Sequence, residues 1–87
     1  MKIITATQLQ TIRDAYEKCK GTPFYLYYHM EFQFKDKNGK WRFCAYTIPF
    51  VNHDCKVKTI RGKQYIMQAD DERFLLTQRV IDLLNEG

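Results

Sequence analysis

Three residues near the middle of the chain, His53, Asp54 and Cys55, have side chains of the types used in nucleophilic catalysis. In an extended segment His53 and Cys55 would share one face, as a general base and a thiol nucleophile must. Such a pair also needs a group that stabilises an oxyanion, and no glycine-rich turn or helix start follows Cys55 to supply one. We therefore rank a small Cys/His enzyme below the other functions and assign no catalytic residue.

The same residues raise the question of a metal site. His29 and Cys44 are the other potential ligands, but structural zinc usually has pairs of closely spaced ligands, and only His53 and Cys55 approach that spacing. With Cys19 the chain has three cysteines, none of them in a Cys-x-x-Cys motif. This pattern predicts free thiols, no metal, no cofactor and a reducing, cytoplasmic location.

Basic residues are concentrated in the middle of the chain. The formal net charge is +4, and residues 18–63 contain ten basic side chains against three acidic ones, a net charge of +7. Such a block attracts an acidic protein surface or a nucleic acid, and tyrosines among the lysines could anchor either partner. The predicted binding residues are Lys35, Lys37, Lys40, Arg42, Tyr27, Tyr46, Lys56, Lys58, Arg61 and Lys63.

Each of these features also has a purely structural interpretation. Lysines on sheet edges prevent strand-to-strand aggregation, and solubility alone would explain them. The six Tyr, six Phe and one Trp bury much area per residue, which a small domain needs for its core. Both interpretations stay open at the level of the sequence.

The first element that positions these residues is a helix predicted over about 6–19. Thr5 and Gln8 have the spacing of a capping box, and Ile4 and Leu9 that of a hydrophobic staple. Gly21 and the proline after it end the helix.

Alternating aromatic residues then predict a strand over 24–35, followed by a second strand over 41–51. Asn38-Gly39 is a strong signal for a two-residue hairpin turn. That turn sets Phe34 opposite Phe43, and Phe32 opposite Ala45. On the other face it sets Lys35 opposite Arg42, and Lys37 opposite Lys40, and these like charges favour an anionic partner.

A second hairpin is predicted over 55–60 and 63–69. Residues 60–62 fit a three-residue turn with Gly62 in the left-handed conformation. In this register Val57 faces Tyr65, and Cys55 faces Met67.

The last element is a helix predicted from about Asp70 to Asn85, with acidic residues in its first turn. Its apolar arc covers about half of the helix, more than one sheet contact needs. We therefore expect Leu75, Leu76 and Leu83 to support a homodimer or the docking of a partner.

The predicted fold is a single α+β domain over residues 1–87, with a helix at each end of an antiparallel sheet of about four strands. The chain has no apolar run long enough for a membrane span or a signal peptide, and it contains no family motif that we can identify. We expect a small non-enzymatic interaction domain that binds a larger macromolecule, such as an inhibitor of the phage or mobile-element (anti-defence) type. A nucleic-acid-binding module with a basic, aromatic sheet is the alternative.

Overall fold

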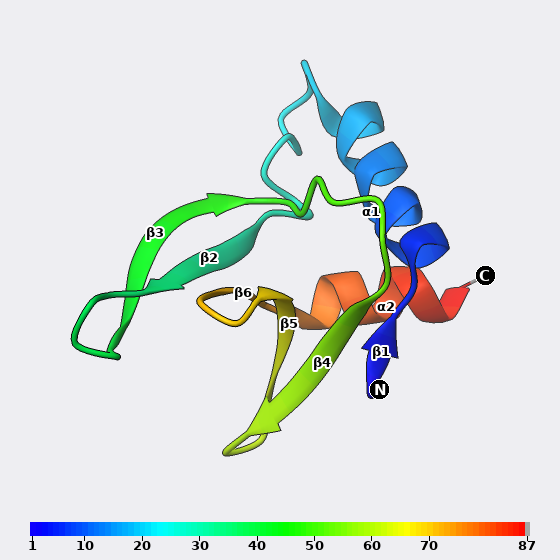
Figure 1. The fold of residues 1–87 in the computed structure, drawn as a ribbon. Coiled ribbons are helices and arrows are strands. Elements are labelled where there is room, and N and C mark those ends of the chain that lie inside the picture. Colours follow the sequence, from blue (N-terminus) through cyan, green and yellow to red (C-terminus); the bar gives the residue numbers. More distant parts are fainter. Residues whose placement is uncertain (87) are drawn as a thin grey trace.

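The computed structural model describes residues 1–86, which form two helices and six strands (Figure 1). The α+β class is confirmed, whereas the sheet has six strands instead of about four. The elements are β1 (Ile3–Ile4), α1 (Ala6–Cys19), β2 (Met30–Lys35), β3 (Trp41–Thr47), β4 (Cys55–Ile60), β5 (Lys63–Ala69), β6 (Glu72–Leu75) and α2 (Gln78–Glu86).

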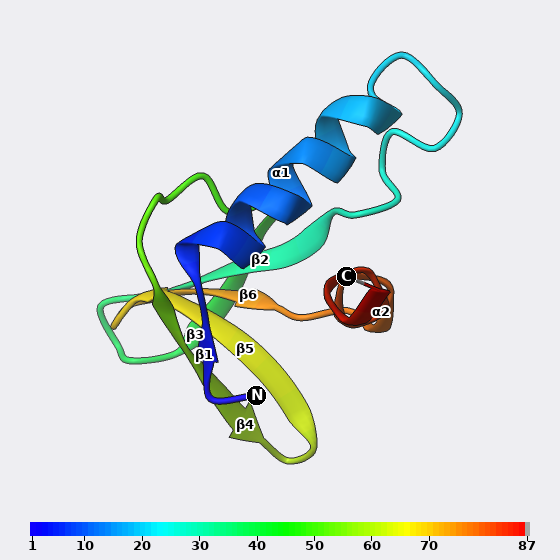
Figure 2. The same cartoon turned by 90° about the vertical axis from the view of Figure 1, so that its right-hand side faces the viewer.

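All of these strands belong to one antiparallel sheet with the order β1-β4-β5-β6-β2-β3. Two hairpins, β2–β3 and β4–β5, therefore lie on either side of β6. They diverge from each other because the sheet is twisted (Figure 1). α1 crosses one face of the sheet, and α2 lies beside it on the same side (Figure 2).

The core lies between this face and the two helices. Val57, Ile66, Phe74 and Phe32 face one another in a row across four adjacent strands. The helices cover this row with Leu9, Ile12 and Val80, all fully buried. Neither described helix has the length and apolar character needed to cross a membrane.

The capping box at the start of α1 is confirmed. Thr5 Oγ1 accepts a hydrogen bond from the Gln8 backbone N–H at 3.1 Å, and Gln8 Oε1 accepts one from the Thr5 N–H at 2.9 Å. The Ala6 N–H donates to the Asp54 carboxylate at 2.8 Å. This last bond ties the helix start to the loop that precedes β4.

The strand predicted over 24–35 is wrong in its first half, because β2 begins only at Met30. Residues 22–28 form successive turns, in which the Tyr25 N–H donates to Thr22 O and the Tyr27 N–H donates to Phe24 O. The Thr22 hydroxyl also accepts from the Phe24 N–H at 3.1 Å. Such side-chain bonds favour turns over strands, which alternation alone does not reveal.

The register of the first hairpin is partly confirmed. Phe32 faces Ala45 as predicted. A β-bulge at Cys44 then shifts the pairing by one residue, so that Phe34 faces Arg42 and the predicted pairing of two phenylalanines is wrong. β3 also ends at residue 47 rather than 51.

The tip of this hairpin spans residues 36–40 instead of a two-residue loop. The Asp36 carboxylate accepts hydrogen bonds from the N–H groups of Asn38 at 2.8 Å and Lys40 at 3.0 Å. Gly39 has a φ of +81°, which explains the glycine at this position. An aspartate that satisfies two backbone donors thus lengthens the loop that Asn38-Gly39 signals.

The second hairpin has the predicted bounds but a different turn. Arg61 and Gly62 form a two-residue turn with φ values of +52° and +81°. Val57 consequently faces Ile66 rather than Tyr65, and the whole predicted register is displaced by one residue.

The helix predicted over 70–85 is wrong at its start. Asp70 and Asp71 lie in a turn, and residues 72–75 form β6, which pairs with both β5 and β2. α2 begins only at Gln78, after Thr77, whose hydroxyl accepts from the Val80 N–H at 3.3 Å. Pairing on both edges satisfies the backbone of β6, and this outweighs its helical propensity.

Candidate binding surface

The structure brings the Cys/His pair together but buries the thiol. Cys55 Sγ lies 3.9 Å from His53 Nδ1 and donates toward the His53 carbonyl oxygen at 3.6 Å. Cys55 is only 3% exposed, and burial, with the Asp54 carboxylate nearby, raises the pKa of its thiol. A buried, protonated thiol is a poor nucleophile, so this geometry suits a core residue better than a catalytic one.

The other potential metal ligands are spread over separate elements. His29 packs edge-on against Tyr16 of α1 with 5.3 Å between ring centroids, whereas Cys44 is exposed on β3. Among residues 1–86, no three His, Cys, Asp or Glu side chains lie close enough together to hold a metal ion. The three cysteines are free thiols.

The face of the sheet away from the helices carries half of the predicted binding residues. We call it the open face and define it by the alternation of side chains and by cross-strand partners, which share a face. Its residues are Ile3 of β1, Lys56, Lys58 and Ile60 of β4, Lys63, Tyr65 and Met67 of β5, Arg73 and Leu75 of β6, Glu31, Gln33 and Lys35 of β2, and Trp41, Phe43 and Tyr46 of β3.

The open face is basic and aromatic. Within the six described strands, Glu31 is its only acidic residue, against four lysines and Arg73. The exposed rings lie at its β3 margin, where Phe43 and Tyr46 are in contact at 5.0 Å between centroids. Five predicted residues share this surface, namely Lys35, Tyr46, Lys56, Lys58 and Lys63.

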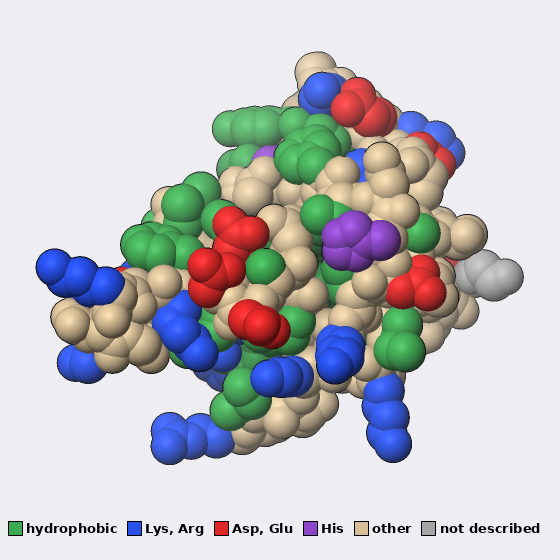
Figure 3. Space-filling view, viewed as in Figure 1, with side chains coloured by type: hydrophobic (Ala, Val, Ile, Leu, Met, Phe, Trp, Pro, Cys, Tyr) green, Lys and Arg blue, Asp and Glu red, His purple; other side chains and the backbone are tan. Residues whose placement is uncertain are grey.

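The remaining predicted basic residues lie elsewhere. Lys37 and Lys40 belong to the tip of the β2–β3 hairpin and Arg61 to that of β4–β5. Figure 3 shows lysine and arginine side chains at both tips. These charges are therefore beside the open face rather than on it.

The like-charge pairs predicted along the first hairpin are wrong, because the register differs. Arg42 Nε donates to Asp36 Oδ2 at 2.9 Å, and this bond, with the backbone donors at the tip, lowers the pKa of Asp36. Lys35 faces Trp41, and its Nζ lies 5.1 Å from the indole centroid. Contacts within the chain thus compensate the charges of Lys35 and Arg42, which were predicted to lie opposite each other.

Tyr27 does not lie on the sheet at all. It belongs to the turns of residues 22–28, where the Arg79 guanidinium of α2 lies 4.1 Å from its ring centroid. Phe24, Tyr25 and Leu26 in the same segment are more than half exposed. This segment is a second apolar surface, separate from the open face.

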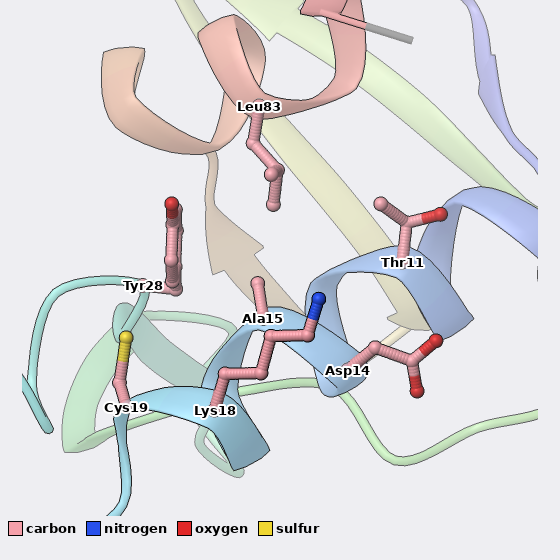
Figure 4. Close-up of a pocket in the computed structure, with 7 residues that line it drawn as sticks. All are labelled: Thr11, Asp14, Ala15, Lys18, Cys19, Tyr28 and Leu83. Atoms are coloured by element: carbon pink, nitrogen blue, oxygen red, sulfur yellow. The ribbon is translucent and has the colours of Figure 1, made fainter.

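A groove runs between α1 and α2 beside this segment (Figure 4). It encloses about 390 Å³, and Leu83 points into it from α2 toward Ala15 of α1. Tyr28 forms one wall, and burial raises the pKa of its hydroxyl. Lys18 and Asp14 lie at the mouth, so the groove is small, mixed in polarity and open to solvent.

The leucine surface predicted on the last helix is not present in that form. Leu75 is on β6 and belongs to the open face, and Leu76 is 6% exposed in the core. Leu83 alone is on α2, where it is partly buried in the groove between the helices. The three residues therefore do not share one surface, because residues 70–77 form a turn, β6 and a short connection instead of the first two turns of the predicted helix.

The centre of the open face holds residues that the sequence did not single out. The Arg73 guanidinium lies 3.9 Å from the ring centroid of Tyr65 and 4.1 Å from that of Trp41. Its Nε donates to Gln33 Oε1 at 2.7 Å, and Gln33 Nε2 donates to Glu31 Oε2 at 2.7 Å. Desolvation in this stack lowers the pKa of Arg73.

The sequence gives only a weak signal for this cluster. Residues 72–75 are two polar side chains followed by two apolar ones, and they lie between Asp70-Asp71 and Thr77, which can form turns. This short segment lacks the alternation of a half-buried strand, and the helical periodicity of residues 74–84 is the stronger pattern. Without β6, nothing indicates that Arg73 faces Trp41 and Tyr65.

Comparison with known protein families, with curated proteins and with solved structures finds no match to this chain.

Proposed function

We propose that this protein is a non-enzymatic interaction domain that binds an acidic partner protein through its open face, and that it inhibits that partner by covering its surface. The observation that supports this is the joint presence of exposed lysines and exposed rings on one helix-free face. Lys56, Lys58 and Lys63 lie toward one margin, and Phe43 and Tyr46 lie toward the other.

The two margins have complementary roles in this proposal. The lysines attract carboxylates over a distance and speed the encounter of the two proteins. Aromatic rings supply the desolvated contact that holds most complexes together. Phe43 is 53% exposed and Tyr46 63% exposed, an unusual amount of free apolar area for two neighbouring rings.

A second candidate function is the binding of single-stranded nucleic acid. The specific observation in its favour is that the two free rings lie on an open antiparallel sheet together with lysines. Bases stack on such rings, and lysines contact the phosphates between them. We rank this function second because the ring pair is small. In addition, residues 22–28 form a further exposed apolar surface, which suits contact with a protein better than contact with a nucleic acid.

The test compares capture by two variants of equal net charge. Lys56→Glu with Lys58→Glu reverses charge on the open face, and Lys18→Glu with Lys20→Glu makes the same change at the C-terminal end of α1. We expect partners identified with wild-type protein to be kept by the α1 variant and lost by the open-face variant. Melting temperatures of both variants establish that they fold.

The nature of the captured partner decides between the two candidates. Retention that survives nuclease treatment and falls gently with salt indicates a protein, whereas a steep salt dependence indicates phosphates. Binding of a fluorescent single-stranded oligonucleotide to the wild-type protein, and loss of this binding in Phe43→Ala and Tyr46→Ala, would establish the second candidate. Equal capture by the two charge variants contradicts a role of the open face in either function.

A further inference from the structure

Among the described strands longer than two residues, β3 is the only one with an edge that no other strand covers at any point. The sheet ends at β1 on one side and at β3 on the other. β1 has only two residues, whereas β3 has seven, from Trp41 to Thr47. An edge strand of this length with exposed apolar residues is a template for pairing with another strand.

We propose that β3 pairs antiparallel with β3 of a second copy of this chain and forms a symmetric dimer with a continuous sheet. This inference goes beyond the proposed function, since it requires no other partner. The reason to expect a second copy of β3 as the pairing strand is a feature of β3 itself, the bulge at Cys44.

The bulge makes the strand complementary to itself. In a regular strand, residues three apart point to opposite faces. Here Phe43 faces Gln33 and Tyr46 faces Glu31, and both rings lie on the open face with 5.0 Å between their centroids. The bulged residue Cys44 accounts for this, since it has no partner on β2.

A two-fold axis normal to the sheet requires that paired residues share a face. The register that sets Phe43 opposite the second copy's Tyr46 meets this condition for that pair and for Arg42 with Thr47, because the bulge inverts the alternation between them. It brings four rings together on the open face. It also sets Arg42 opposite the second copy's Thr47 on the helix side of the sheet.

Charge does not oppose this register. Arg42 is already paired with Asp36 at 2.9 Å. The antiparallel arrangement sends the basic tip of each hairpin past the end of the other β3, so that Lys37 and Lys40 of the two copies point away from each other. An acidic extended segment of another protein is the alternative occupant, but it does not explain the match of the rings.

The test is the mass of the protein in solution, measured without any ligand by sedimentation equilibrium as a function of concentration. We expect the mass to rise from 10.5 kDa toward twice that value. Phe43→Lys and Tyr46→Lys place a lysine on the paired edge and should keep the protein monomeric. Ile3→Lys is the matched control, because Ile3 is 54% exposed like Phe43 but lies on β1 at the opposite edge of the sheet, and it should behave as wild type.

A thiol cross-link then tests the register. In the proposed pairing Cys44 faces the second copy's residue 45, so mild oxidation should join Ala45→Cys into covalent dimers much faster than the wild type. Faster cross-linking of the wild type would mean that Cys44 faces itself, which contradicts the register.

The dimer is refuted by a monomer mass at about 1 mM, where a dissociation constant of that size would leave half of the chains paired. It is equally refuted by a dimer that Phe43→Lys and Tyr46→Lys leave intact. Because no partner is present in these measurements, their failure leaves the proposed function untouched, and the charge-variant capture tests that function separately.

Discussion

The guanidinium of Arg73 lies over the ring of Tyr65, with its Cζ 3.9 Å from the ring centroid, and both residues are more than nine-tenths buried. A buried arginine keeps its charge, so the energy of this group depends on the rings and on Gln33 around it. Tyr65, Arg73 and Trp41 thereby link β5, β6 and β3 across the open face.

We expect Arg73→Lys to lower the free energy of unfolding by about 1–3 kcal/mol, because an ammonium cannot stack on both rings and bond Gln33 at once. Urea titration measures this loss. Trp41 is the only tryptophan in the sequence, so its fluorescence reports the stack directly and should shift to longer wavelength. Arg79→Lys is the control, since Arg79 contacts Tyr27 at an exposed site and should lose only about 0.5 kcal/mol. Equal losses would contradict a special role of the buried stack.

The turn of the second hairpin offers a stabilising substitution. Arg61 has a φ of +52°, in the left-handed region that most residues avoid and that asparagine tolerates. Arg61→Asn creates the favoured Asn-Gly turn and should raise the free energy of unfolding by about 0.5–1 kcal/mol. Gly62→Ala should lower it, because Gly62 has a φ of +81°. Thermal melts of both variants check the opposite signs, and a destabilised Arg61→Asn would argue against this turn.

Thr5→Ala removes the hydroxyl of the capping box and should destabilise the protein by about 1 kcal/mol. Thr7→Ala, in the first turn of the same helix, removes a hydroxyl from an exposed position and should raise stability by a few tenths of a kcal/mol, because alanine has the higher helix propensity. Guanidinium unfolding curves of the two variants that coincide would mean that the capping bond contributes nothing.

The buried thiol of Cys55 predicts a loss of stability at alkaline pH. Burial raises its pKa above the ordinary value of 9.0, so the folded protein keeps a proton that the unfolded chain releases. Its contribution is complete below about pH 9 and falls as the pH rises further. Melting temperatures between about pH 8 and 10 should decline more steeply in wild type than in Cys55→Ala, because the tyrosines that begin to ionise in this range are common to both proteins. Cys44→Ala, which removes an exposed thiol, should keep the wild-type slope.

The elements that the sequence predicts well are those with local signals. Helix α1 has a capping box at its start and a glycine just beyond its end, and both bounds agree with the prediction. The strands of the second hairpin are flanked by a polar loop and a glycine turn, and their bounds agree as well. Signals of this kind act within a few residues and need no knowledge of the fold.

The errors have the opposite origin. β6 is a strand because β5 and β2 pair with its two edges. Of these two partners only β5 is adjacent to β6 in the chain, so the pairing with β2 cannot be seen locally. The bulge at Cys44 and the five-residue tip held by Asp36 each shift a register by one residue without any change in hydrophobic pattern. The candidate site inherits these errors, since the lysines of β4 and β5 were found but Arg73 was assigned to a helix.

The position of β6 in the sheet also sets the order in which this protein assembles during synthesis. β6 lies between the two hairpins, yet it is the last strand to leave the ribosome. Until residue 75 has emerged, β2–β3 is a two-stranded ribbon separate from the strands β1, β4 and β5, and such a ribbon is marginal on its own. The sheet therefore closes late and in one step, and a message truncated before β6 yields a chain that cannot join its halves.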